Sequence, residues 1–185
     1  QSIVIDSYNE NPFNSPNDLV FTRTGVAYFT DPDFQKAAAP GGQPVTGVYQ
    51  VKDGKALLID GSLKNPNGIA LSADETKLYV AGGEENGALR EYTLFQDAVT
   101  ATRDLVKDVK VPDGMTVDCH GNIYLTEHSY QQVRVFNPEG QQIATIKTDA
   151  NVTNATFGGN DGKTLYLTGA GVLWKLPLDV TGISK

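Results

Sequence analysis

The chain has 185 residues, and its 15 Lys and Arg against 22 Asp and Glu give a formal net charge of −7. This acidic balance, without a run of basic residues, argues against nucleic acid and anionic membranes as partners, because both are bound mainly through Lys and Arg near phosphates. The lone Cys119 excludes an internal disulfide and a thiolate zinc finger, and no apolar run approaches the roughly 18 residues of a membrane-spanning helix. We therefore expect a soluble chain, and its length alone predicts one domain. The composition indicates no particular compartment.

The first expected element is a single strand over residues 1–8, which has no obvious partner in the sequence. Four repeats follow, each with an apolar residue, a polar turn and an alternating strand centred on a tyrosine. These tyrosines are Tyr28, Tyr79, Tyr124 and Tyr166. Further strand-like segments follow them at residues 47–51, 56–60, 88–94, 102–106, 133–137, 142–147 and 172–178. Short runs rich in Val, Tyr, Leu and Thr, divided by Gly, Asp, Asn and Pro, predict strands and turns rather than helices.

The repeats predict an all-β fold of the β-propeller type. Repeats of about 40 to 50 residues with four strands each are typical of propeller blades, whereas solenoid repeats, the alternative, are usually shorter or helical. The chain would supply about four blades and the additional first strand. Either four blades close into a ring, or they belong to a larger propeller whose other blades come from the rest of the protein or from another copy.

A short polar motif precedes the first strand of each repeat. The motifs place Asn17, Asn67, Asp113 and Asn154 at matching phases of the repeat. First strands of propeller blades line the central channel, so these side chains are predicted to converge near its axis. Amide and carboxylate oxygens, without imidazole or thiolate, suit a hard cation such as Ca²⁺ or Mg²⁺. The alternative is that these residues only build turns.

The two histidines have weaker functional interpretations. His120 lies in a polar turn, where a solvated side chain is expected. His128 follows the strand of Tyr124, and we take the tyrosine strands as the first strands of their blades. A histidine that faces the channel could serve as a general base. The assumed strand order, however, places His128 and the corresponding Asp31 at the channel mouth opposite the cation. We therefore leave both residues out of the catalytic set.

Together the motifs resemble the gluconolactonase family, which includes senescence marker protein (regucalcin) and luciferin-regenerating enzyme. The matching segments are residues 14–19, 28–32, 65–72, 112–118, 154–159 and 165–168. They cover nearly the whole chain and occur in the order of the family. One such motif would be weak evidence, but four in order are specific.

The resemblance implies a six-bladed propeller with one divalent cation at a channel mouth, Ca²⁺ first, with Zn²⁺ or Mg²⁺ as alternatives. The family binds its cation through a Glu of the first blade, two Asn and an Asp. Matched by motif, these ligands are Asn17, Asn67 and Asp113, and the Glu has no counterpart here. Ser15 stands where regucalcin-like members carry an Arg that helps to hold the substrate. Ser15 and Asn154 are expected to line the channel.

The activity implied by the resemblance is hydrolysis of a lactone, the cyclic ester of a sugar acid or a similar small molecule. The cation would act as a Lewis acid and Asp113 as the general base. Because the Glu and about two blades lack counterparts, we expect a propeller without its N-terminal third, and weak metal binding and activity in the isolated chain. Two alternatives stay open. One is a non-catalytic propeller that binds a small molecule or a protein, and the other is a phosphotriesterase resembling diisopropylfluorophosphatase.

Overall fold

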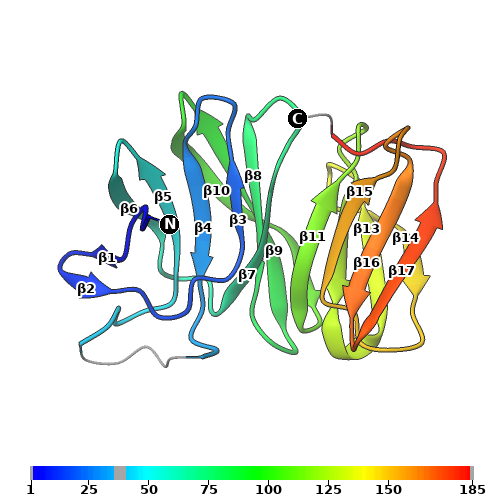
Figure 1. Ribbon diagram of the computed structural model, residues 1–185, viewed down its shortest axis with the longest axis horizontal. Coiled ribbons are helices and arrows are strands. Elements are labelled where there is room, and N and C mark those ends of the chain that lie inside the picture. The colour runs from blue at the N-terminus through cyan, green and yellow to red at the C-terminus, as the bar shows by residue number, and fades with distance from the viewer. Residues whose placement is uncertain (1, 36–40, 184–185) are drawn as a thin grey trace.

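The computed structural model describes residues 2–35 and 41–183, in which β-strands form nearly all the regular structure (Figure 1). A small hairpin of β1 (Ser7–Tyr8) and β2 (Asn11–Pro12) precedes four antiparallel sheets. The first contains β3 (Leu19–Phe21), β4 (Ala27–Asp31), β5 (Gly47–Lys52) and β6 (Lys55–Asp60), and the second contains β7 (Pro66–Leu71), β8 (Lys77–Gly82), β9 (Gly87–Phe95) and β10 (Ala98–Val109). The third contains β11 (Pro112–Val117), β12 (Ile123–Glu127), β13 (Gln132–Phe136) and β14 (Gln142–Lys147), and the fourth contains β15 (Asn154–Gly158), β16 (Thr164–Gly169) and β17 (Val172–Pro177).

The four sheets are consecutive propeller blades. Within each sheet the strands pair in chain order, and the first strands of neighbouring sheets contact one another, β3 with β7, β7 with β11 and β11 with β15. Figure 1 shows the sheets as a row that runs from β6 to β17. We call them the first to the fourth blade. The predicted all-β architecture of about four blades is confirmed.

The interfaces between blades are apolar layers that contain three of the four repeat tyrosines. Tyr28 is fully buried between the first and second blades, where it belongs to the same cluster as Val48 and Leu78. Tyr79 and Tyr124 lie in the corresponding clusters of the next two interfaces. A buried tyrosine contributes a large apolar area but needs a partner for its hydroxyl, and Tyr28 donates to the backbone oxygen of Asp97 at 2.7 Å. The repeat thus marks the packing between blades.

Two expectations about strands are wrong in detail. Residues 1–8 do not form one strand, because in the described part of this segment only Ser7–Tyr8 is a strand, paired with β2. The tyrosine strands β4, β8, β12 and β16 are the second strands of their blades, each antiparallel to the strand before it. A second strand runs back toward the start of the first, so its last residues return to the same edge of the blade.

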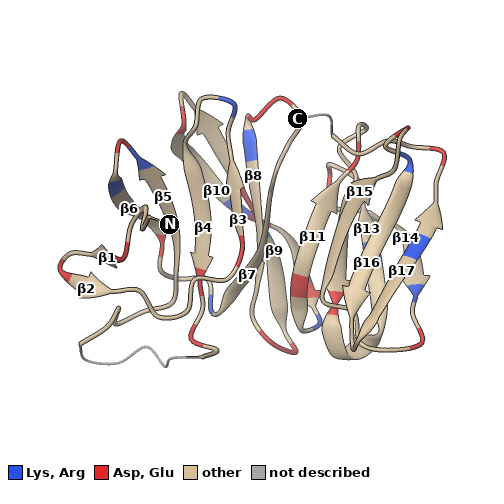
Figure 2. Cartoon of the chain, in the orientation of Figure 1, with Lys and Arg blue, Asp and Glu red and all other residues tan. Residues whose placement is uncertain are grey.

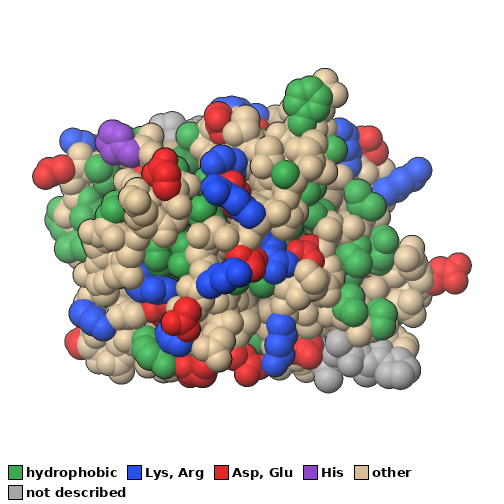
Figure 3. Space-filling model, turned by 180° about the vertical axis from the view of Figure 1, so that it is seen from behind, with side chains coloured by type: hydrophobic (Ala, Val, Ile, Leu, Met, Phe, Trp, Pro, Cys, Tyr) green, Lys and Arg blue, Asp and Glu red, His purple; other side chains and the backbone are tan. Residues whose placement is uncertain are grey.

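The surface carries charges of both signs. Figure 3, the side hidden in Figure 1, shows basic and acidic side chains interspersed among polar and apolar ones. Within the described ranges, no helix has the length and apolar character needed to cross a membrane.

Candidate functional site at the entrance mouth

The inner strands of the four blades line a hollow of about 830 Å³. Asp18 and Asn154 border it where the inner strands begin, and Arg23 and Glu75 border it near the turns that follow β3 and β7. We call these two ends the entrance mouth and the hairpin mouth. The residues predicted from the repeat lie at or just before the starts of β3, β7, β11 and β15, and hence at the entrance mouth.

Asp113, the second residue of β11, has a strongly shifted pKa. Burial raises the pKa of its carboxyl to about 6, and the charge of Asp18 acts in the same direction. His128, a side-chain hydrogen bond from Asn67 and the backbone N–H of Gly114 oppose this shift. Figure 2 shows a red segment in β11, whose only acidic residue is Asp113. A carboxyl with a pKa of about 6 is suited to take up and release a proton near neutral pH.

Asn67, the second residue of β7, is brought directly against Asp113. The residue is 7% exposed, and its side chain hydrogen-bonds to the Asp113 carboxyl. Its backbone oxygen accepts the Thr30 hydroxyl at 2.7 Å, which ties it to the first blade. A Cβ on Gly68 would lie 2.2 Å from the backbone oxygen of Asp113, so the close approach of β7 and β11 requires glycine there. The Pro-Asn-Gly and Pro-Asp-Gly motifs therefore interlock.

Asn154, the first residue of β15, borders the hollow beside the third blade. A Cβ on Gly114 would lie 2.1 Å from Asn154 Oδ1, so the amide packs over the residue that follows Asp113. The N–H of Gly114 donates to the backbone oxygen of Thr153 at 2.8 Å. Asn154 Oδ1 also accepts the N–H of Ala155 at 2.8 Å. The structure thus brings Asn67, Asp113 and Asn154 together.

The first blade brings Asp18 to the hollow, whereas the predicted Asn17 lies at a separate cavity. Asn17 is exposed and lines a second cavity, of about 210 Å³, beside Leu19 and Phe21. Asp18 borders both this cavity and the main hollow, and its carboxylate accepts the N–H of Ile69 at 3.3 Å. Asp18 therefore joins the site from a position that the motif analysis passed over.

Ser15 occupies a different place from the one its motif indicates. Its side chain is buried, its N–H donates to the Asp31 carboxylate at 2.7 Å, and its hydroxyl oxygen accepts the N–H of Gln35 at 3.1 Å. Of the predicted site residues, only Asn154 lines the hollow itself; Ser15, Asn17, Asn67 and Asp113 are not among the described residues that line it. Ser15 belongs to the wall that supports the Asn17 segment.

Asp31 and His128 lie at the entrance mouth, so their placement at the opposite mouth is wrong. Each follows or ends a second strand, and these strands return to the start of the inner strand. His128 begins a short 3-10 turn (His128–Tyr130) and donates its N–H to the backbone oxygen of Val111 at 3.0 Å. Its electrostatic interaction with Asp113 lowers the pKa of the Asp113 carboxyl. Antiparallel pairing of the first two strands was the signal that could have placed both residues correctly.

The donors at the entrance mouth fit a hard divalent cation through their chemistry. In the described part of the chain, no three His, Cys, Asp or Glu side chains gather as a metal cluster. The mouth instead combines the partly buried Asp113, the nearby charge of Asp18 and amide groups of Asn67 and Asn154. Carboxylate and amide oxygens are ligands that Ca²⁺ and Mg²⁺ prefer. A cation would also favour the charged form of Asp113, which burial disfavours.

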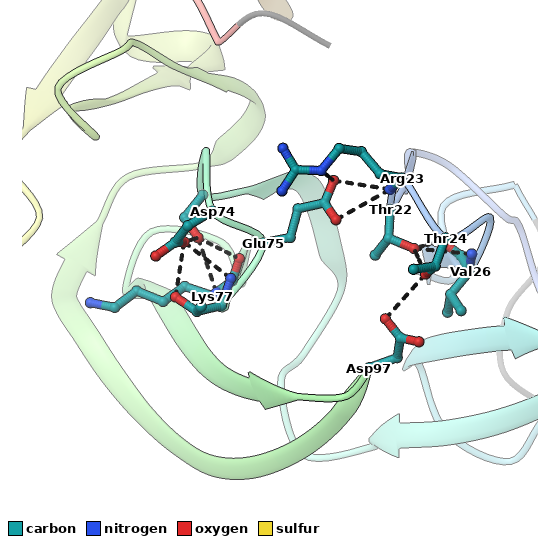
Figure 4. Close-up of polar contacts among 10 residues, drawn as sticks. Thr22, Arg23, Thr24, Val26, Asp74, Glu75, Lys77 and Asp97 are labelled. Atoms are coloured by element: carbon teal, nitrogen blue, oxygen red, sulfur yellow. Dashed lines mark hydrogen bonds and ion pairs between the residues drawn. The ribbon is translucent and has the colours of Figure 1, made fainter.

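The hairpin mouth is built from exposed, paired charges (Figure 4). The N–H of Arg23 donates to both carboxylate oxygens of Glu75, at 3.0 and 3.2 Å, and the Arg23 Nε lies 3.5 Å from the same carboxylate. Thr24 donates to the Asp97 carboxylate at 3.4 Å. The Arg23 side chain is 66% exposed. These contacts join the turn after β3 to the second blade, which is a structural role.

The sequence profile described as "SMP-30/Gluconolactonase/LRE-like region" matches residues 2–171. The chain belongs to this family. A gluconolactonase of Zymomonas mobilis is 32% identical over 91% of this chain and 51% of the relative. The lactonase drp35 of Staphylococcus epidermidis is 34% identical over 82% of this chain and 45% of the relative. The chain thus spans about half the length of these curated relatives.

Solved structures agree with this membership. A gluconolactonase from Xanthomonas campestris has a TM-score of 0.83 and 31% identity, with 94% of this chain and 60% of that chain covered. A calcium-binding regucalcin from Agrobacterium tumefaciens has a TM-score of 0.77 at 21% identity, with 90% of this chain and 62% of that chain covered, and this likeness concerns the fold alone. The family resemblance and the propeller prediction are confirmed, and the solenoid alternative is excluded.

Proposed function

We propose that this protein is a metal-dependent lactonase, which opens a cyclic ester of a sugar acid or a similar small molecule at the entrance mouth. The observation that carries the proposal is the pair of Asn67 and Asp113, an amide hydrogen-bonded to a partly buried carboxyl whose pKa is raised to about 6. Relatives named gluconolactonase and lactonase support the reaction class. Because the chain spans only part of these relatives, the activity is proposed for the protein in its complete natural form.

Asn67 and Asp113 would hold the cation, with Asn17 as the third ligand from the family pattern. When bound, a divalent cation supplies Lewis acidity toward an ester carbonyl and lowers the pKa of a bound water. The oxygen donors favour Ca²⁺, with Zn²⁺ and Mg²⁺ as the other candidates.

The chain's own residues would handle the proton and the substrate. Asp113 accepts the proton of the attacking water as general base, while Asn67 fixes the orientation of its carboxyl through their hydrogen bond. Water adds to the carbonyl carbon, the bond to the ring oxygen breaks, and that oxygen takes up a proton. The hollow of about 830 Å³ has the size of a small-molecule site, and Asp18 and Asn154 offer acceptors for sugar hydroxyls.

The test is a comparison of substrates and cations with the complete protein. Glucono-1,5-lactone and a phosphotriester are assayed after chelation and after re-addition of Ca²⁺, Zn²⁺ or Mg²⁺. We expect hydrolysis of the lactone that chelation abolishes and one of these cations restores. Preference for the phosphotriester would support the phosphotriesterase alternative instead. Binding of lactone without turnover in every cation would support a non-catalytic binding propeller and contradict the proposal.

A further inference from the structure

Two carboxylates at one phase of the repeat hold the segments that lead into Asn17 and Asp113. Asp31 ends β4 and Glu127 ends β12, and both side chains are fully buried. We propose that Asp31 and Glu127 are positioning residues, which fix these segments and thereby set the cation affinity of the entrance mouth. The inference rests on the proposed function, since it concerns the same site.

Asp31 binds the segment before Asn17 with both of its oxygens. Oδ2 accepts the N–H of Asn14 at 2.9 Å, and Oδ1 accepts the N–H of Ser15 at 2.7 Å. The neighbouring Thr30 continues the contact, because its backbone oxygen accepts the N–H of Asn17 at 2.9 Å. Charge-assisted hydrogen bonds in a buried setting are strong and directional. The backbone that carries Asn17 is therefore held from the end of β4.

Glu127 binds the backbone of the segment before Asp113, as Asp31 binds the segment before Asn17. Its Oε1 accepts the N–H of Lys110 at 2.8 Å and lies 3.0 Å from Arg134 Nε. Its Oε2 accepts the side-chain amide of Gln132. The carboxylate is thus oriented from the third blade, and one oxygen is directed at the backbone three residues before Asp113.

The segment that Glu127 holds has an unfavourable backbone conformation. Val111, directly after Lys110, has a φ of 43°, in the left-handed region that β-branched residues rarely adopt. Its N–H donates to the backbone oxygen of Glu84 at 2.8 Å, and its oxygen accepts the N–H of His128 at 3.0 Å. Such strain persists only where surrounding contacts enforce it, and it gathers near functional sites. Without Glu127 the segment would relax, and Asp113 would move with it.

Neither carboxylate is assigned as a cation ligand. Removing either one should therefore change the cation affinity indirectly, through the backbone segment that it holds. Supporting residues of this kind typically change metal affinity or activity by 10–100-fold when removed. The prediction is a loss of cation affinity that does not follow from a loss of stability. This distinguishes positioning from a general structural contribution.

The test is calorimetric titration of Ca²⁺ into the complete protein, combined with hydrogen exchange at the Lys110 amide. Glu127→Ala should weaken Ca²⁺ binding about 10–100-fold and speed exchange at Lys110 beyond the change in global stability. Glu127→Gln keeps an acceptor oxygen for Lys110 and should bind within about threefold of the wild type. The matched control is Glu91→Ala, which removes a buried carboxylate paired with Lys77 and Arg103 in the second blade. It should lower the Tm and leave the Ca²⁺ Kd unchanged.

Unchanged Ca²⁺ affinity in a folded Glu127→Ala protein would overturn the inference. If that variant does not fold, Asp31→Asn decides, because an amide group there replaces one of two acceptor oxygens. It should lose at least about tenfold in affinity, and a wild-type Kd would overturn the inference. A wild-type protein that binds none of the three cations contradicts the proposed function itself. Normal wild-type binding with unaffected variants contradicts only the positioning roles.

Discussion

Two partly buried carboxylates, Asp60 in the first blade and Asp113 in the third, have pKa values shifted in opposite directions. Burial raises the pKa of Asp60, but hydrogen bonds from the Tyr92 hydroxyl, the Ser62 N–H and Arg90 outweigh it and lower that pKa to about 2. The bonds from Tyr92 and Arg90 are each 2.7 Å long and reach across from the second blade. Asp60 therefore joins two blades as a fully paired anion.

Asp113 is also partly buried, but the groups around it do not compensate for the loss of solvent contact. Burial dominates and raises its pKa to about 6, and the largest remaining influences, which include Asn67 and His128, contain no Lys or Arg. A carboxylate that stabilises the fold is surrounded by donors, whereas a carboxylate in a reactive site is held where its charge is costly. The comparison assigns a structural role to Asp60 and a chemical role to Asp113.

The largest expected effect is on turnover. In the complete protein, Asp113→Asn should lower kcat/KM for lactone hydrolysis by at least about 10²-fold, because it removes the general base and a cation ligand. Asp60→Asn, a matched change of a partly buried carboxylate outside the mouth, should leave kcat/KM within about threefold when assayed below its unfolding temperature. Initial-rate kinetics on both variants measure this difference, and equal losses would break the comparison.

The second-largest expected effect is a loss of stability when Asp60 is substituted. Asp60→Asn should lower the free energy of unfolding at pH 7 by about 3 kcal/mol, because it removes a charge-assisted pair and weakens the partner of a buried tyrosine hydroxyl. The folded pKa lies below the ordinary value of 3.8, so this contribution is present above about pH 4 and is lost as the pH falls toward 2. Urea unfolding of wild type and variant at pH 7 and at pH 2.5 should show the difference shrink, and a difference independent of pH would contradict the assignment.

The contribution of Asp113 to stability should change with pH in the opposite direction to that of Asp60. Its folded pKa lies above the unfolded value, so its stability contribution is fully present below about pH 4 and is lost as the pH rises through about 6. Asp113→Asn should therefore raise the free energy of unfolding by about 2 kcal/mol at pH 7 without divalent cations. The gain should vanish at pH 4 in the same urea experiment. A destabilised variant at pH 7 would show that Asp113 is a structural anion like Asp60.

The smallest expected effect is the change in stability caused by a substitution at the hairpin mouth. Arg23→Gln removes an exposed ion pair with Glu75, and exposed pairs contribute less than about 1 kcal/mol. Thermal unfolding at low and high salt should differ little between wild type and variant. A loss well above this size would show that the hairpin mouth, too, depends on a buried charge.

The packing of the fold was readable from the sequence because the tyrosine strands are buried and strongly patterned. Tyr28 is fully buried and Tyr79 nearly so, and strands of this kind give a clear signal. The inner strand β3 has three residues, of which only Val20 is buried, so its pattern is weak. The stronger strand was therefore mistaken for the inner one, and Asp31 was assigned to the wrong mouth.

The sequence predicts only those site residues that occupy matching positions in the repeats. Asn67 and Asp113 occupy matching motifs, and the structure brings them into contact. Asp18 and Glu127 act through partners far away in the sequence, Ile69 and Lys110, which depend on how blades and strands pack. Val111 is a further example, because a β-branched residue gives no sequence signal for a left-handed conformation.

The central claim is that Asn67 and Asp113 hold the cation on which lactone hydrolysis depends. Crystals of the complete protein grown with saturating Ca²⁺ test it most directly. We expect a cation about 2.3–2.6 Å from an Asp113 carboxylate oxygen and from the Asn67 amide oxygen. A cation bound elsewhere, with the Asn67–Asp113 hydrogen bond intact, would contradict it.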